Sequence, residues 1–109
     1  MLGALTGDII GSIYEWNNIK TTEFPLYTAS CGFTDDSVLT VALAESILTG
    51  KSYGTLMREY YYRYPEAGYG GSFHEWARSK HPAPYDSWGN GAAMRISPLD
   101  GHLILWKWF

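Results

Sequence analysis

Two adjacent acids stand beside two hydroxyl side chains at Thr34, Asp35, Asp36 and Ser37, directly before a long apolar stretch. Neighbouring carboxylates repel each other, so a fold that holds them together must offset the repulsion with a helix N-terminus, hydrogen bonds or a bound cation. Carboxylate, hydroxyl and water oxygens are the ligands that Mg²⁺, Mn²⁺ and Ca²⁺ prefer. The same residues also suit a helix cap, because Thr34 or Asp35 can cap the helix while Asp36 complements its dipole. A cation site and a simple cap are both open interpretations of this tetrapeptide.

A second candidate site is a loop of small residues before a predicted helix start at residues 92–95. The loop consists of Ser87, Trp88, Gly89, Asn90 and Gly91. Glycines let a backbone approach a ligand closely, and the first N–H groups of a helix, together with its dipole, favour anionic oxygens. The loop therefore suits phosphate binding. The alternative is a structural turn in which Trp88 fills space in the core.

A helix near the N-terminus is the first element that must position these residues. Its apolar side chains recur three or four residues apart, at Leu2, Leu5, Ile9 and Ile13. Gly3, Gly7 and Gly11 fall four residues apart and form a stripe without side chains. This stripe predicts the close approach of another backbone or a ligand.

Three polar residues, Asp8, Ser12 and Glu15, share one face of the same predicted helix. Acids on a helix surface are commonly solvated, so this face is either exposed to solvent or turned toward a site. The sequence alone leaves both alternatives open.

A buried central helix is predicted from residue 36 to residue 49, where apolar side chains cover all sides and Gly50 follows as a C-terminal stop. Residues 17–32 before it show no lasting period and read as a loop. The acids at the start of the central helix therefore stand on rigid scaffolding, which is a better platform for ligands than a free loop.

Further helices are predicted after Gly50. A tyrosine-rich amphipathic helix spans residues 53–64, with most of its tyrosines in the core, and Pro65 ends it. Ser72 and Glu75 have the spacing of a capping box that opens a short helix. The three histidines lack the spacing of zinc ligands or a catalytic triad, so surface positions are expected for them.

The composition limits the classes of function. With 109 residues and no visible linker the chain fits one small domain, and its net charge of −3 with scattered basic residues argues against binding to a nucleic-acid duplex. Cys31 is the only cysteine, so an intramolecular disulfide is excluded and a reducing compartment is favoured. The first 13 residues lack the basic region of a signal peptide, and no membrane span is visible. We therefore expect a cytoplasmic protein without a membrane partner, whose oligomeric state the sequence does not reveal.

Three groups of residues occur in a distinctive order. They are Gly3-Ala4 with Gly7-Asp8 and Tyr14-Glu15, then Phe33-Thr34-Asp35-Asp36-Ser37, then Ser87-Trp88-Gly89-Asn90-Gly91-Ala92-Ala93-Met94-Arg95. In this order and spacing they resemble the N-terminal part of the ADP-ribosylglycohydrolase family, and the resemblance covers nearly all of residues 1–98. Each motif is weak alone, but the ordered set is specific.

The resemblance implies an all-α, orthogonal helical domain with a binuclear Mg²⁺ site. Such a domain removes ADP-ribose from a modified protein side chain or a related acceptor, which makes ADP-ribose or an ADP-ribosylated protein the expected partner. Thr34, Asp35 and Asp36 match the family's first metal-binding motif, with Asp36 and Glu15 as candidate catalytic acids. Asp8 would support the first helix from a neighbouring face. The loop at residues 87–91 matches the segment that holds ADP-ribose, in agreement with the phosphate argument above.

The resemblance weakens after Pro98, and residues 99–109 form an off-pattern apolar tail. The family supplies a second Asp-rich motif from its C-terminal half, and that ligand set is missing here. We therefore expect a hydrolase domain that is incomplete in this chain, through truncation or a shifted reading frame. The alternatives are a non-catalytic ADP-ribose-binding or oligomerising remnant, and a helical fragment whose acids merely cap helices.

Overall fold

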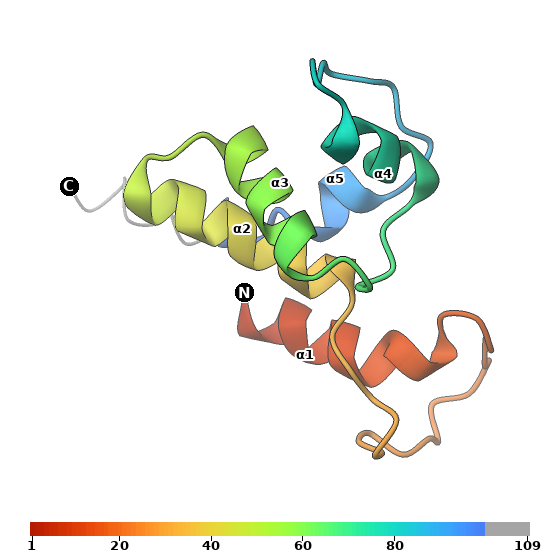
Figure 1. Ribbon diagram of the computed structural model, residues 1–109. Coiled ribbons are helices and arrows are strands. Elements are labelled where there is room, and N and C mark those ends of the chain that lie inside the picture. The colour runs from red at the N-terminus through yellow and green to blue at the C-terminus, as the bar shows by residue number, and fades with distance from the viewer. Residues whose placement is uncertain (100–109) are drawn as a thin grey trace.

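The computed structural model describes residues 1–99, and these residues form helices without any strand (Figure 1). The all-α class predicted from the sequence is confirmed. The predicted apolar tail lies, apart from Leu99, outside the described residues. The elements are α1 (Leu2–Gly11), the 3₁₀ helix η1 (Ser12–Tyr14), α2 (Asp35–Thr49), α3 (Tyr53–Arg63), α4 (Gly71–Arg78) and α5 (Gly91–Met94).

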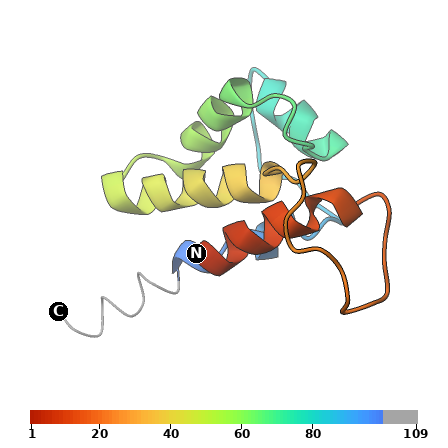
Figure 2. The same ribbon diagram turned by 90° about the horizontal axis from the view of Figure 1, so that it is seen from below.

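Helix α2 lies at the centre of the molecule, with α1 on one side of it and α3 and α4 on the other (Figures 1 and 2). Helix α5 also contacts α2. The buried residues of α2 belong to its N-terminal half, from Ser37 to Ala42. The entrance of α2 is therefore held from several sides, whereas its C-terminal half is more open and Leu48 is exposed.

An aromatic core lies between α2, α3 and α4. Its buried members are Val38, Leu39, Tyr61, Tyr69, Phe73 and Ala77. The Tyr69 and Phe73 rings are stacked with centroids 5.2 Å apart, and Tyr61 meets Tyr69 at 5.1 Å. Aromatic pairs at these separations add to the free energy of burial. The expectation that most α3 tyrosines are core is only partly right, because Tyr61 is buried whereas Tyr62 is well exposed.

Helix α1 contacts α2 but buries none of its own residues fully. Leu2 is 79% exposed. Among the described residues no other backbone approaches the glycine stripe closely, since a Cβ added at Gly3, Gly7 or Gly11 would meet nothing within 4 Å, and the approach of a ligand there stays a prediction. Helix α1 therefore contacts α2 through side chains rather than through a backbone groove.

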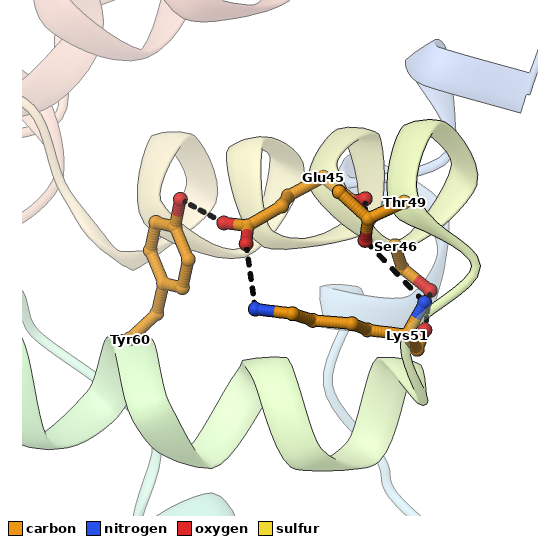
Figure 3. A network of polar contacts seen from close by, with 5 residues as sticks. All are labelled: Glu45, Ser46, Thr49, Lys51 and Tyr60. Atoms are coloured by element: carbon orange, nitrogen blue, oxygen red, sulfur yellow. Dashed lines mark hydrogen bonds and ion pairs between the residues drawn. The ribbon is translucent and has the colours of Figure 1, made fainter.

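A polar network joins the C-terminal half of α2 to α3 (Figure 3). The Tyr60 hydroxyl donates to Oε2 of Glu45 at 2.8 Å, and Nζ of Lys51 lies 3.6 Å from Oε1 of the same carboxylate. This hydrogen bond to Glu45 is the main reason why the pKa of Tyr60 is raised. Ser46 and Thr49 complete the network by bonding to backbone groups of Lys51 and Glu45. One carboxylate thus links α2, the following turn and α3.

The predicted capping box at Ser72 and Glu75 is wrong. Helix α4 begins at Gly71, its N-cap is Gly70, and no side chain caps it. Ser72 consequently lies inside the first turn. The C-terminal end of α4 is held by a side chain of α3, because Arg58 donates to the carbonyl oxygens of Ala77 and Ser79 at 2.9 and 3.1 Å. A basic side chain at this end satisfies carbonyl groups that no helical N–H can reach.

The C-cap of α2 supports a first prediction. Gly50 has φ +71°, and its N–H bonds to the carbonyl oxygen of Ser46 at 2.9 Å. We expect Gly50→Ala to lower the free energy of unfolding by about 1 kcal/mol, because an L-residue is strained in this conformation. Gly7→Ala is the matched control, and should raise it by about 0.5–1 kcal/mol, since its Cβ meets nothing and alanine favours the helix. Urea unfolding of both variants measures the difference, and equal effects would contradict the prediction.

No helix among the described residues is long and apolar enough to cross a membrane.

Candidate functional site

Asp8 connects α1 to the entrance of α2. Its Oδ2 accepts hydrogen bonds from the backbone N–H groups of Thr34 and Ser37, at 2.8 and 3.2 Å, and from the Ser37 hydroxyl at 2.5 Å. Its Oδ1 accepts from the Thr34 hydroxyl at 2.6 Å. Both carboxylate oxygens are therefore occupied by groups that belong to the first turn of α2. The face shared by Asp8, Ser12 and Glu15 is turned toward α2 at Asp8 rather than simply solvated.

Thr34 is the N-cap of α2. Its side-chain oxygen accepts a hydrogen bond from the N–H of Asp36 at 3.3 Å while its hydroxyl proton goes to Asp8. The capping interpretation of the tetrapeptide is correct for Thr34. Because Thr34 and Asp8 satisfy the N–H groups of Asp36 and Ser37, capping does not require the carboxylates of Asp35 and Asp36.

The Asp35 carboxyl lies under the turn that precedes α4. The Asp35 N–H donates to the carbonyl oxygen of Ala67 at 2.7 Å, and a Cβ added at Gly68 would lie 3.9 Å from Oδ1 of Asp35. Burial first, and then the negative charges of Asp36, Glu15 and Asp8, together raise the pKa of Asp35 to about 7. A hydrogen bond from the backbone of Asp35 itself lowers this pKa but offsets only part of the rise.

Asp36 shares this environment. Burial and then the charges of Asp8 and Glu15 raise its pKa above the ordinary value. Glu15 follows η1 on an exposed turn, close enough for its charge to act on both aspartates. The fold therefore gathers four acids from α1, the turn after η1, and α2, and within residues 1–99 Asp8 is the one whose carboxylate accepts hydrogen bonds from other residues.

The donor chemistry of Asp35 and Asp36 fits a hard divalent cation. A positive charge between them would offset the repulsion and burial that raise both pKa values. Among residues 1–99 no group of three His, Cys, Asp or Glu side chains is arranged to hold a metal ion. Mg²⁺ in proteins is often held by one or two carboxylates and keeps several waters. The pair therefore fits part of a Mg²⁺ coordination sphere, with the remaining ligands to come from elsewhere.

The loop at residues 87–91 is open and lies before the four-residue helix α5. The Ser87 side-chain oxygen accepts from the Gly89 N–H at 3.1 Å, and Trp88 is fully exposed rather than plugging the core. Asn90 occupies the N-cap position of α5 without a side-chain hydrogen bond. Within the described part of the chain no hydrogen bond or ion pair joins this loop to the acids. The structure thus brings together the predicted metal residues and Glu15, but shows no direct contact of these with residues 87–91.

Two residues near this site were not identified from the sequence. Tyr69 is only 5% exposed, its hydroxyl has no hydrogen-bond partner among the described residues, and burial together with the charge of Asp35 raises its pKa to about 12. His74 was expected at the surface, but its Nδ1 lies 2.9 Å from the hydroxyl of buried Tyr61. The signal that could have found Tyr69 is its place in the Tyr69-Gly70-Gly71 segment, directly after the turn over Asp35.

Comparison with known families decides what kind of domain carries this site. The family model described as ADP-ribosylglycohydrolase matches residues 1–106, nearly the whole chain. The chain belongs to the ADP-ribosylglycohydrolase family. No curated protein and no solved structure matches it significantly. The resemblance found in the three ordered motifs is thereby confirmed, and the all-helical structure agrees with the helical ADP-ribosylglycohydrolase domain.

Proposed function

We propose that this ADP-ribosylglycohydrolase domain takes part in the Mg²⁺-dependent removal of ADP-ribose from a modified protein side chain or a related acceptor. The observation that carries the proposal is the pair of carboxylates at the start of α2. Capping is already provided by Thr34 and Asp8, yet Asp35 and Asp36 are held in a partly buried, negatively charged place where no other described residue donates a hydrogen bond to their carboxylates. Such an arrangement lowers the stability of the metal-free fold, and it is useful for holding a cation.

The proposed roles follow from position. Asp35 and Asp36 hold Mg²⁺ together with Thr34, whose side-chain oxygen keeps one lone pair after its two hydrogen bonds. Bound Mg²⁺ would polarise a water or the ribose hydroxyls at the glycosidic bond. Glu15 is exposed enough to meet a substrate, and with Asp36 it is the candidate to move protons as an oxocarbenium-like centre develops. Residues 87–91 are proposed to bind the ADP-ribose moiety, with their exposed backbone turned to a ligand rather than to the core.

The binuclear site that the resemblance implies requires a second ligand set, and among residues 1–99 no group of three His, Cys, Asp or Glu side chains is arranged to hold a metal ion. We therefore propose that turnover depends on further ligands, while binding of Mg²⁺ and ADP-ribose can be measured on the chain itself. The prediction of a cytoplasmic location rests on Cys31 being the only cysteine, and it stays a prediction.

Thermal unfolding with and without Mg²⁺ plus ADP-ribose tests this proposal. Ligands at about 100 times their Kd should stabilise the folded chain by about 2.7 kcal/mol and raise the Tm accordingly. Asp35→Asn and Asp36→Asn should each lose most of this ligand-dependent rise, because each removes one anionic ligand. Glu59→Gln, at an exposed position of α3, removes one negative charge that lies away from the site and should keep the ligand-dependent rise in Tm. An equal rise in all four proteins would contradict the assigned ligands, and the lack of any rise in the wild-type chain would remove the binding proposal.

A second candidate function is ADP-ribose binding without catalysis, or assembly with other chains. It is favoured by the absence of a three-ligand metal group within the described residues and by the full exposure of Trp88. Calorimetry with ADP-ribose in the presence of EDTA discriminates between the two proposals. Undiminished binding of ADP-ribose without metal would favour a non-catalytic ADP-ribose-binding protein. Release of free ADP-ribose from a modified protein in the presence of Mg²⁺ would favour the hydrolase. Sedimentation as a monomer would argue against assembly.

A further inference from the structure

The hydroxyl of Tyr69 is a buried polar group without a partner. Tyr69 is only 5% exposed, and among residues 1–99 its hydroxyl neither donates nor accepts a hydrogen bond. Burying an unpaired hydroxyl costs free energy, and a phenylalanine would fill the same space in the core without that cost. Buried polar side chains are otherwise paired in folded proteins, so a role other than packing is expected for this hydroxyl.

The ring of Tyr69 is held in the aromatic core from several sides. It stacks on Phe73 with ring centroids 5.2 Å apart, and its centroid lies 5.1 Å from that of Tyr61 and 5.9 Å from that of His74. The Tyr61 hydroxyl is already used, because it lies 2.9 Å from Nδ1 of His74. The core therefore fixes the place of the Tyr69 hydroxyl without bonding to it.

The turn before α4 brings Tyr69 to the start of α2 (Figure 1). Within this turn the carbonyl oxygen of Ala67 accepts from the Asp35 N–H at 2.7 Å, and a Cβ added at Gly68 would lie 3.9 Å from Oδ1 of Asp35. Asp35 is also the acid whose charge raises the pKa of Tyr69. An O–H group without an acceptor thus lies near a carboxylate to which no other described residue donates.

We propose that Tyr69 is a positioning residue for Asp35, and that its hydroxyl donates a hydrogen bond to the Asp35 carboxylate when this carboxylate holds Mg²⁺. A hydrogen bond to a ligand carboxylate fixes its orientation and raises the affinity for the metal. A charged acceptor also makes such a bond stronger than one between neutral groups. The inference rests on the proposed function, because it takes Asp35 as a Mg²⁺ ligand.

Tyr53 offers an internal comparison. Its hydroxyl is also buried without a partner among the described residues. Burial raises its pKa to about 12, and the charge that acts on it is the positive charge of Arg95, whose guanidinium carbon lies 5.8 Å from the centre of the Tyr53 ring. The two tyrosines therefore share an unpaired hydroxyl and differ in the nearby carboxylate, which only Tyr69 has.

Calorimetric titration of Mg²⁺ into the full chain tests the inference. Tyr69→Phe keeps the packed ring and removes only the hydroxyl, so the Kd for Mg²⁺ should rise at least about tenfold. The matched control is Tyr53→Phe, which removes an unpaired hydroxyl away from the acids. Its Kd for Mg²⁺ should stay within about twofold of the wild-type value, as for a site independent of the metal.

Thermal unfolding in EDTA separates positioning from packing. Neither variant should have a lower Tm than the wild-type chain, because each loses a buried hydroxyl that makes no hydrogen bond in the metal-free fold. The inference is overturned if Tyr69→Phe keeps the wild-type Kd for Mg²⁺, if Tyr53→Phe weakens Mg²⁺ binding equally, or if the Tm of Tyr69→Phe falls in EDTA. An unchanged Kd in Tyr69→Phe would leave the proposed function intact, whereas a wild-type chain that binds no Mg²⁺ would overturn both.

Discussion

Replacing Asp8 by alanine is expected to lower the free energy of unfolding by about 3 kcal/mol, the largest loss among the polar residues of this site. The carboxylate accepts four hydrogen bonds from the main chain and side chains of Thr34 and Ser37. Hydrogen bonds to a charged group contribute about 1.5–3 kcal/mol, and donors left unpaired in a part-buried place add a further cost. The change also removes the link between α1 and α2, since α1 has no fully buried side chain to hold it there.

Urea unfolding followed by circular dichroism measures this effect, and hydrogen exchange at Thr34 and Ser37 shows where it arises. Glu15→Ala is the matched control, because Glu15 is an exposed acid near the same helix entrance. We expect the control to change the free energy of unfolding by less than about 0.5 kcal/mol. Comparable losses for Asp8→Ala and Glu15→Ala would show that the loss reflects general charge rather than the hydrogen bonds of Asp8.

Replacing Asp35 by asparagine is expected to make the metal-free chain more stable at pH 8, by about 1–2 kcal/mol once partial exposure is allowed for. The pKa of Asp35 is raised from 3.8 in the unfolded chain to about 7 in the folded chain. Between these values the folded state binds more protons than the unfolded state, so the free energy of unfolding falls as pH rises. Below about pH 4 the carboxyl is neutral in both states, and the cost of its charge disappears.

The measurement is the free energy of unfolding against pH, from 4 to 8, in EDTA. The wild-type value should decline across the window from about 4 to about 7 set by the two pKa values, and the Asp35→Asn curve should be flatter. Glu59→Gln removes one negative charge from an exposed helix position and serves as the control. A wild-type chain that gains stability from pH 4 to pH 7 relative to Asp35→Asn would mean that the Asp35 charge is favourable in the folded state.

Local signals predicted several elements correctly. The hydroxyl of Thr34, the acids after it and Gly50 marked the two ends of α2, because capping and positive φ act within one turn of the backbone. Pro65 likewise lies just beyond α3. The capping box at Ser72 was predicted wrongly, because α4 begins at Gly71 with Gly70 as its N-cap. The contacts that hold α4 in place, from Arg58 of α3 and in the core around Phe73 and Ala77, cannot be read from its local sequence.

The residue types of the candidate site were predicted from the sequence, but the separate structural roles of these residues were not. Asp35 and Asp36 were expected to be either caps or metal ligands, and the structure separates these duties by giving the cap to Thr34. That separation depends on Asp8, which lies 26 residues before Thr34. Tyr69 was missed for a similar reason, since its burial against Asp35 requires the turn before α4 to return to α2.

The sequence by itself determined that two carboxylates stand at the entrance of a helix, and it also determined the residue at which that helix ends. Its three ordered motifs place the chain in its family. Only the tertiary structure decided which acid is structural and which acids are left without donors. The physical reason is that helix ends depend on neighbours within a few residues, whereas the hydrogen bonds of Asp8 and the burial of Asp35 arise when distant segments pack together. The raised pKa values, and with them the proposed affinity for a cation, follow from that packing.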